Sequence, residues 1–314
     1  MNRIQPDFRR RFRPHQRYLL GLSGGRDSVA LLYWLTDCGY KNLICCHLNH
    51  RLRSRSSHAD ARFVEKLADK YGVDLVIGSA NVRALASKQK LSIEAAAREA
   101  RYKFFAQVAE QKRVRTIFLA HHADDVVETF LINLFRGSGT AGLSAIREVS
   151  KRRIGNLDLT IVRPFLGIWR SQIDDYGRKH RLKFREDVSN KDLALFRNRI
   201  RRQIIPYLEK AIGRNIRHSI WRAAIITAAE EDWIETQLPN ATGPELSVLE
   251  LRKLPVALQR REILKWLRAR KIPNVRFDVV ENIRSLLDRN ARVAKVNLPQ
   301  NRHVRRRAGK IFIE

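Results

Sequence analysis

The sequence is poor in several features that would mark particular classes of protein. It contains three cysteines, Cys38, Cys45 and Cys46, an odd number without a C-x-x-C pair, which argues against a disulfide framework or a structural zinc site. No apolar run approaches about 20 residues, so no transmembrane helix is expected. The basic N-terminal stretch lacks the apolar core of a signal peptide. These absences predict a cytoplasmic protein with no membrane partner.

Acidic residues are also scarce beside basic ones. The chain has 62 Lys and Arg against 32 Asp and Glu, a net charge of +30. So large an excess repels itself unless a polyanion neutralises it, and nucleic acid is the usual polyanion inside cells. The alternative is a solvated basic surface without a ligand. RNA binding that weakens steeply with salt would separate the two.

Short apolar runs alternate with helical patterns through the first half of the chain. The candidate strands are 18–22, 43–48, 75–78 and 116–120, and the candidate helices are 28–37, 58–71, 93–112 and 123–135. This alternation predicts an α/β fold with a doubly wound, mostly parallel sheet. Ligands of such sheets bind beyond the carboxyl ends of the strands. The charged segment 147–158 is expected to be an irregular surface connection.

The remainder of the chain has a different pattern. It indicates a helical stretch over 208–237, a loop over 238–244, helices over 258–271 and 279–288, and strands over 293–298 and 310–313. We therefore predict a catalytic domain over 1–210 and a smaller helical or α+β domain over 211–314. The cluster His303, Arg305, Arg306 and Arg307 is either a phosphate contact or a solvated turn.

The sharpest motif follows the first predicted strand and opens a helix. It consists of Ser23, Gly24, Gly25, Arg26, Asp27 and Ser28. Two glycines permit a tight turn, and the amides at a helix N-terminus favour an anion such as phosphate. The carboxylate of Asp27 beside phosphate implies a bridging Mg²⁺. An ordinary helix cap is the alternative. The motif resembles the PP-loop of ATP pyrophosphatases, which cleave ATP between the α and β phosphates and transfer AMP.

A second cluster follows the fourth predicted strand. Its ionisable members are His121, His122, Asp124, Asp125 and Glu128. Helical spacing gathers the three carboxylates toward one side of the first turns, which predicts an acidic pocket. Dipole compensation at a helix N-terminus explains one carboxylate but not three. A dedicated zinc site is disfavoured because adjacent histidines at a strand end point in opposite directions.

These motifs, together with several others, resemble the tRNA(Ile)-lysidine synthetase family. The matching stretches are 23–28, 47–53, 94–102, 120–129, 136–143, 163–164, 186–190 and 197–206. The resemblance implies a ligase that uses ATP to adenylate C2 of the wobble cytidine in an isoleucine tRNA with a CAU anticodon. Free L-lysine then displaces AMP, which changes decoding from AUG to AUA.

The resemblance also implies roles for particular residues. The phosphate loop would bind ATP, with Asp27 holding Mg²⁺; Arg98, Arg101 and His121 would surround ATP and the activated base. Asp125 and Glu128 would bind lysine, and one of them or a neighbour would act as base. The residues expected to grip the anticodon are Arg197, Asn198, Arg199 and Arg201. The oligomeric state is left open, a homodimer included.

Some alternatives remain at this stage. Arg26 is unusual in the loop and either adds a phosphate contact or points to solvent, and Glu94 with Arg98 could form an ordinary i,i+4 ion pair. The nearest rival function is tRNA 2-thiolation, disfavoured because Cys45 and Cys46 are adjacent on a predicted strand and alternation separates their side chains. A basic RNA-binding protein without activity is the other rival.

Overall fold

A computed structural model describes residues 5–51, 54–144, 146–185, 192–193, 195–239, 243–273, 275–289 and 295–314. The matching stretch 186–190 lies outside these residues. The chain divides into two compact units, Met1–Ala228 and Ala229–Glu314, while the domain boundary at residue 210 stays a prediction. None of the helices in the described ranges is long and apolar enough to span a membrane.

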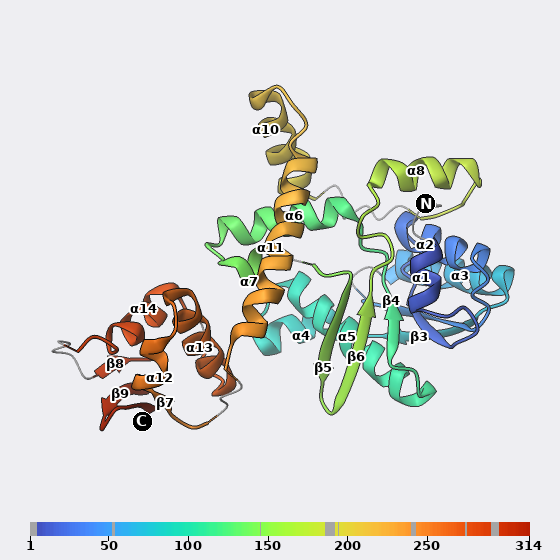
Figure 1. The fold of residues 1–314 in the computed structure, drawn as a ribbon. Helices are drawn as coiled ribbons and strands as arrows, with labels where there is room; N and C mark the ends of the chain where they lie inside the picture. The colour runs from blue at the N-terminus through green and yellow to red at the C-terminus, as the bar shows by residue number, and fades with distance from the viewer. Residues whose placement is uncertain are drawn as a thin grey trace. The chain divides into compact units, whose positions relative to one another are not determined.

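The first unit is built on a six-stranded sheet (Figure 1). Its strands are β1 (Tyr18–Gly21), β2 (Leu43–Asn49), β3 (Asp74–Ser79), β4 (Thr116–Phe118), β5 (Val149–Ile154) and β6 (Leu157–Val162). They lie in the order β3-β2-β1-β4-β6-β5, and all neighbours are parallel except β5 with β6. The predicted mostly parallel sheet is confirmed. The chain runs from β1 outward through β2 to β3 and then returns to β4 on the other side of β1. The strand order therefore reverses between β1 and β4, and the ligand crevice is expected there.

The expectation of an irregular connection over 147–158 is wrong. These residues form β5 and the start of β6, a hairpin that turns at Gly155 with φ +59°. Edge strands can carry many charged side chains because only one side of the strand pairs within the sheet. The polar run Lys151, Arg152 and Arg153 therefore looked like a loop in the sequence.

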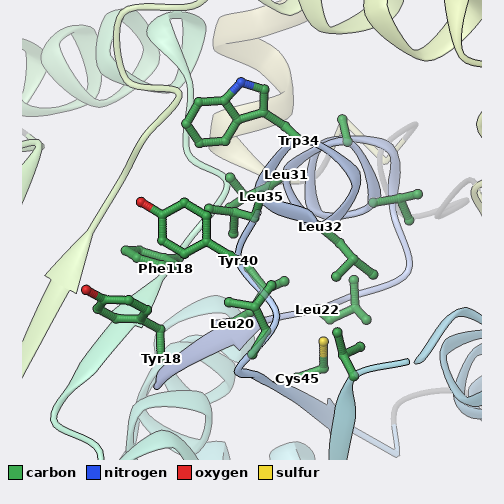
Figure 2. Close-up of a cluster of buried hydrophobic side chains, with 14 of the residues drawn as sticks. Tyr18, Leu20, Leu22, Leu31, Leu32, Trp34, Leu35, Tyr40, Cys45 and Phe118 are labelled. Carbon is green, nitrogen blue, oxygen red and sulfur yellow. The ribbon is translucent and has the colours of Figure 1, made fainter. Parts of the chain in front are cut away.

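Helices cover both faces of this sheet, as a doubly wound fold requires. Those that pack on it or flank the site are α2 (Arg26–Asp37), α3 (Ser54–Tyr71), α5 (Ile93–Lys112), α6 (Ala123–Phe135) and α8 (Arg170–Lys179). Successive strand residues face opposite sides. Leu20 packs in a core with Trp34 of α2 (Figure 2), whereas Leu19 packs with Phe105 of α5 in a second core. The two cores fix the register of β1.

The other helices of this unit lie at its edges or follow the sheet in the chain. They are α1 (Gln5–Arg11), α4 (Val82–Gln89), α7 (Thr140–Leu143), α9 (Phe196–Arg199), a π-helical turn (Ile200–Ile204), α10 (Ile205–Ile212) and α11 (Arg217–Gln237), which runs on into the second unit. The π-helical turn is notable because such turns are frequent at functional sites.

The second unit is an α+β domain, as predicted. It contains α12 (Val248–Lys253), α13 (Val256–Ala269), α14 (Phe277–Ser285), β7 (Leu246–Ser247), β8 (Lys295–Asn297), β9 (His303–Arg307) and β10 (Lys310–Ile313). The strands form an antiparallel sheet in the order β7-β10-β9-β8. The core joins Ile263 and Trp266 of α13 to Val304 and Ile311 of the sheet. The cluster His303–Arg307 is thus a strand and not a turn.

Glu262 of α13 predicts how the stability of this unit depends on pH. Its side chain is buried, both carboxylate oxygens lack a hydrogen-bond partner, and burial raises its pKa above the ordinary 4.5. The folded protein therefore holds this proton more tightly than the unfolded chain, so stability falls as pH rises from 4.5 through the folded pKa. Glu262→Met is expected to stabilise the protein at pH 7 by about 1–3 kcal/mol in urea unfolding.

The gain in the Glu262→Met protein is expected to shrink as the pH approaches 4.5, because the native carboxyl group is then neutral as well. Glu250→Met is the matched control, since Glu250 is exposed and pairs with Lys253 at 2.8 Å. A gain that did not change with pH would contradict the explanation by burial of charge.

Candidate active site

The phosphate loop joins the end of β1 to the start of α2. Gly24 has φ +81°, a conformation that side-chain-bearing residues rarely adopt. Gly25 is the N-cap of α2 and no side chain caps this helix, so its first amides are available to an anion. The Ser28 hydroxyl donates to the Gly25 carbonyl at 2.9 Å and lies 3.0 Å from the Ser23 hydroxyl. The Ser23 and Gly25 amides also donate within the loop, to the Ser28 and Ser23 hydroxyls at 3.2 and 3.3 Å. The loop is therefore held internally, and the amides that remain for an anion are those of the first turn of α2.

A cavity of about 610 Å³ lies at this loop, at the carboxyl ends of β1 and β4. Its volume falls within the range of about 300–1,000 Å³ typical of small-molecule sites. The lining includes Ser23, Gly25, Arg26, Asp27, Ser28, Arg101, His121, His122, Asp125, Arg170, Arg185, Arg201 and Arg202. The two motifs predicted to share a site thus face one cavity.

Asp27 has the environment of a cation ligand. Its Oδ1 is buried without a hydrogen-bond partner, and its Oδ2 lies 3.8 Å from Nε2 of His122. Burial raises the pKa of Asp27, an effect that His122 opposes. Among the described residues, no group of three or more His, Cys, Asp and Glu side chains could hold a metal. A Mg²⁺ ion at Asp27 would therefore need oxygens from a bound ligand such as phosphate.

The adjacent histidines differ in charge. Burial opposes protonation of His122, but Asp125, Asp124 and Asp27, all within 3.8 Å of its ring, outweigh that effect and raise its pKa. Burial lowers the pKa of His121 to about 3. The three carboxylates therefore favour the protonated form of His122, whereas His121 is neutral at pH 7 and its buried Nδ1 has no partner.

Arginines from the C-terminal part of the first unit hold the carboxylates of α6. Asp125 Oδ1 accepts from Arg197 Nη2 at 2.9 Å, and Asp125 Oδ2 accepts from the His122 amide at 3.0 Å. Glu128 is fully buried and accepts from Arg197 Nε at 2.8 Å and Arg201 Nε at 2.5 Å. The carboxylates predicted to form an acidic pocket are therefore paired with arginines, and their role in binding lysine stays a prediction.

Asp124 is compensated in the same way. It accepts from Nη1 of Arg217 and from the amide of Arg170, both at 2.9 Å. Of the three acids in this cluster, Asp125 alone is among the residues that line the 610 Å³ cavity. Asp125 is thus the acid through which a ligand in the cavity can meet the cluster.

The four residues expected to grip the anticodon do not share one surface. Arg197 and Arg201 turn toward the α6 carboxylates, and buried Asn198 donates to the carbonyl of Asp192 at 2.7 Å. Arg199 is exposed and lies over the ring of Phe196, 5.4 Å from its centroid. Their role in tRNA binding stays a prediction.

Arg98 and Arg101 lie on the same helix but face different cavities. Arg101 lines the large cavity, whereas Arg98 lines a smaller one that shares His121 with it. Sequence reasoning missed three cations of the large cavity, Arg170, Arg185 and Arg202. Arg202 lies within the matching stretch 197–206 and the other two lie near such stretches, but none of them carries a motif signal of its own.

The side chain of Arg26 bridges the phosphate loop to the segment around α8. Its Nη1 lies 2.5 Å from Asp174 Oδ1, and its guanidinium lies 4.8 Å from the centroid of the Phe184 ring. The Arg185 amide also donates to the Gly24 carbonyl at 3.0 Å. Both contacts tie the loop to residues 174–185. Arg26 is therefore not a purely solvated side chain, and because it lines the cavity a phosphate contact stays a prediction.

This bridge predicts a modest effect on nucleotide affinity. Asp174→Asn weakens the hold on Arg26, and because the pair is partly exposed its loss costs at most about 1 kcal/mol. The KM for ATP is expected to rise by up to about fivefold with kcat nearly unchanged, measured by pyrophosphate release. Asp175→Asn is the control, since Asp175 pairs with Arg178 on the exposed side of α8. Equal effects in both variants would contradict the bridge.

The glycine loop on a parallel sheet, with Asp27 facing a cavity at the switch point, defines a PP-loop nucleotide-binding protein. A family model described as a PP-loop domain matches residues 2–208, and one described as a TilS substrate binding domain matches residues 246–312. The chain belongs to the tRNA(Ile)-lysidine synthase family. Its N-terminal unit carries the first match and its C-terminal unit the second.

Relatives with that name match over most of the chain. A tRNA(Ile)-lysidine synthase of Thermosynechococcus vestitus is 32% identical over 92% of this chain and 83% of the relative. The one of Geobacter sulfurreducens is 37% identical over 92% of this chain, which spans 63% of that relative. Among solved structures, a U34-tRNA thiolase of Methanococcus maripaludis with a [4Fe-4S] cluster has a TM-score of 0.53 at 18% identity, covering 73% of this chain and 78% of the thiolase. That likeness shows the fold alone.

Proposed function

We propose that this protein uses ATP to activate a cytidine of tRNA and then joins lysine to it. The observation that carries the proposal is that the phosphate loop, His121 and Asp125 line a single cavity. A nucleotide, a base and an amine can therefore meet in one place. The names of the relatives support the choice of an isoleucine tRNA and of lysine. The buried free cysteines suit a cytoplasmic setting.

In the first step, the C2 oxygen of the cytidine attacks the α-phosphorus of ATP. A bond forms between that oxygen and phosphorus, and the bond to the bridging oxygen breaks, so pyrophosphate leaves. The amides of the phosphate loop and the guanidinium groups of Arg101 and Arg170 face this charge and stabilise it. Mg²⁺ bound at Asp27 would neutralise the phosphate oxygens.

In the second step, the side-chain ammonium of lysine releases a proton to solvent. The free amine then attacks C2, the bond from C2 to its oxygen breaks, and AMP leaves with that oxygen. Asp125 is suited to bind the lysine ammonium, because it lines the cavity and its pKa is held well below the usual range. Burial by itself raises the pKa of Asp125, but the positive charges of His122 and Arg197 lower it by more than burial raises it. A strongly lowered pKa favours ion pairing over acceptance of the amine proton.

Glu128 is placed differently from Asp125. It is fully buried behind Arg197 and Arg201, so lysine reaches it only if one guanidinium moves away. We therefore assign direct contact with lysine to Asp125. In this proposal Glu128 positions Arg197, which in turn contacts Asp125.

The test uses the purified protein with ATP, Mg²⁺, an isoleucine tRNA with a CAU anticodon and isotopically labelled lysine. Mass spectrometry of the tRNA nucleosides is expected to show one labelled lysine on cytidine, with one AMP and one pyrophosphate released. A tRNA with uridine at the reacting position is the control and is expected to stay unmodified. The absence of ATP turnover with tRNA would leave a non-catalytic RNA-binding protein.

The thiolation alternative is disfavoured by the cysteines. Cys45 packs in the core against α2 and Cys46 in the core against α5, so their side chains lie on opposite faces of the sheet. Burial raises the pKa of both thiols, that of Cys46 to about 12. The thiolate that sulfur chemistry requires is therefore strongly disfavoured. Sulfur in the modified nucleoside would overturn this conclusion.

A further inference from the structure

A second, smaller cavity lies beside the β5–β6 hairpin, between it and α5. We call it the hairpin pocket; its volume is about 240 Å³, and its polar lining includes Arg98, Tyr102, His121, Lys151, Arg152 and Arg163. It shares His121 with the nucleotide cavity. Whatever occupies it therefore lies next to the place where the base would react.

The lining of the hairpin pocket is strongly cationic. With Arg147 it carries five Arg and Lys residues, and the described lining contains no Asp or Glu to balance them. Burial, with a smaller effect of Arg98, lowers the pKa of Arg163. The nearby carboxylate of Glu99 acts on Arg152 but pairs with Lys103 and does not line the pocket. Five cations in a lining without a carboxylate favour an anionic ligand.

The cations of this pocket are held in place by the protein. Arg163 is buried and donates through Nη1 to the Arg147 carbonyl at 2.7 Å and to the Ser150 hydroxyl at 3.0 Å. Its Nε is buried without a partner. Arg152 lies over the Tyr102 ring, 4.1 Å from the centroid. Guanidinium groups fixed in this way suit a phosphate group, which accepts two parallel hydrogen bonds.

We propose that the hairpin pocket binds a backbone phosphate of the tRNA next to the reacting cytidine, an assignment that rests on the proposed function. The ATP phosphates lie at the phosphate loop in the other cavity, so the RNA supplies the phosphate here. The pocket then anchors the strand while the base enters beside His121. The carboxylate of free lysine is the other anionic group that could occupy the hairpin pocket. The experiment below distinguishes binding of that carboxylate from binding of an RNA phosphate.

The first experiment compares two neighbouring arginines of β5. Arg152 lines the pocket, whereas Arg153 pairs with Asp158 at 3.8 Å and does not. In the full chain, Arg152→Ala is expected to raise the Kd for tRNA about tenfold. It is also expected to lower the slope of log Kd against log salt by about 0.7, the value for one phosphate of a single strand. Arg153→Ala is expected to change neither quantity, and urea unfolding verifies that both variants fold.

Other outcomes overturn the proposal. If Arg152→Ala raises the KM for lysine and leaves the Kd for tRNA unchanged, the pocket holds the carboxylate of the amino acid. If the two arginine variants behave alike, the pocket binds neither. The Kd measurement requires no turnover, so a protein that binds tRNA through Arg152 but transfers no lysine would refute the reaction and leave the pocket assignment standing.

A second experiment locates the phosphate. tRNA assembled with one neutral methylphosphonate linkage, on either side of the reacting cytidine, removes a single backbone charge. At the linkage that the pocket binds, the neutral group is expected to weaken binding to the wild-type protein about tenfold. The same neutral group is expected to leave the Kd of the Arg152→Ala protein unchanged, because that protein already lacks the contact. Additive losses at both linkages would show that Arg152 and that phosphate do not interact.

Discussion

Asp27→Asn is expected to lower the rate of pyrophosphate release from ATP at least about 100-fold, the typical cost of removing one group that stabilises transition-state charge. The buried, unpartnered Oδ1 of Asp27 faces the cavity at the phosphate loop, and a neutral amide there cannot hold a divalent cation against phosphate. The rate of pyrophosphate release is measured at saturating ATP while the Mg²⁺ concentration is raised. Higher Mg²⁺ is expected to restore little of the activity of Asp27→Asn.

Asp60→Asn is the matched control for Asp27. Asp60 lines the same cavity, but its exposed carboxylate pairs with Arg185. This control is expected to retain activity within a few fold. Retained activity in Asp27→Asn, or an equal loss in Asp60→Asn, would show that the metal and phosphates lie elsewhere in the cavity.

The sequence predicted those parts of the fold whose local signals agree with their packing. The helix predicted over 93–112 has those ends in the structure, where Ser92 caps its first turn and accepts from the Ala95 amide at 3.2 Å. The buried strands were recognisable as short apolar runs between charged residues. In contrast, α8 was missed because it buries only Ile173 and Gly177, too few apolar positions to produce a helical period.

The site was predictable to the extent that the fold dictates it. Asp27 and Asp125 follow neighbouring parallel strands, whose carboxyl ends meet at one edge of the sheet. The arginine partners of α6 were not predictable in this way. Arg197 and Arg201 lie 69 and 73 residues from Glu128 along the chain. Arg197 precedes the π-helical turn and Arg201 lies within it. Their direction depends on that local change of helical pitch, which residue spacing does not reveal.

The same arginines make the stability of the first unit depend on Glu128, which is buried between them. Glu128→Gln leaves Arg197 and Arg201 facing a neutral amide, and breaking a buried ion pair costs about 3–5 kcal/mol. Both guanidinium groups are about a quarter exposed and gain some solvent, so the lower end of that range is expected. Urea unfolding of the full chain measures the loss in the transition of the first unit. Glu99→Gln, at an exposed pair with Lys103, is the control.

A compensating variant separates stability from substrate binding. Adding Arg201→Met to Glu128→Gln removes one unpaired charge and is expected to restore part of the lost stability, because a buried ion pair can be replaced by apolar atoms at little cost. The KM for lysine is expected to rise more in Asp125→Asn than in this double variant, since Asp125 lines the cavity and Glu128 does not. A stable Glu128→Gln protein with a greatly raised KM for lysine would instead place the ammonium on Glu128 itself. In that case Arg197 or Arg201 would have to leave the carboxylate when lysine binds.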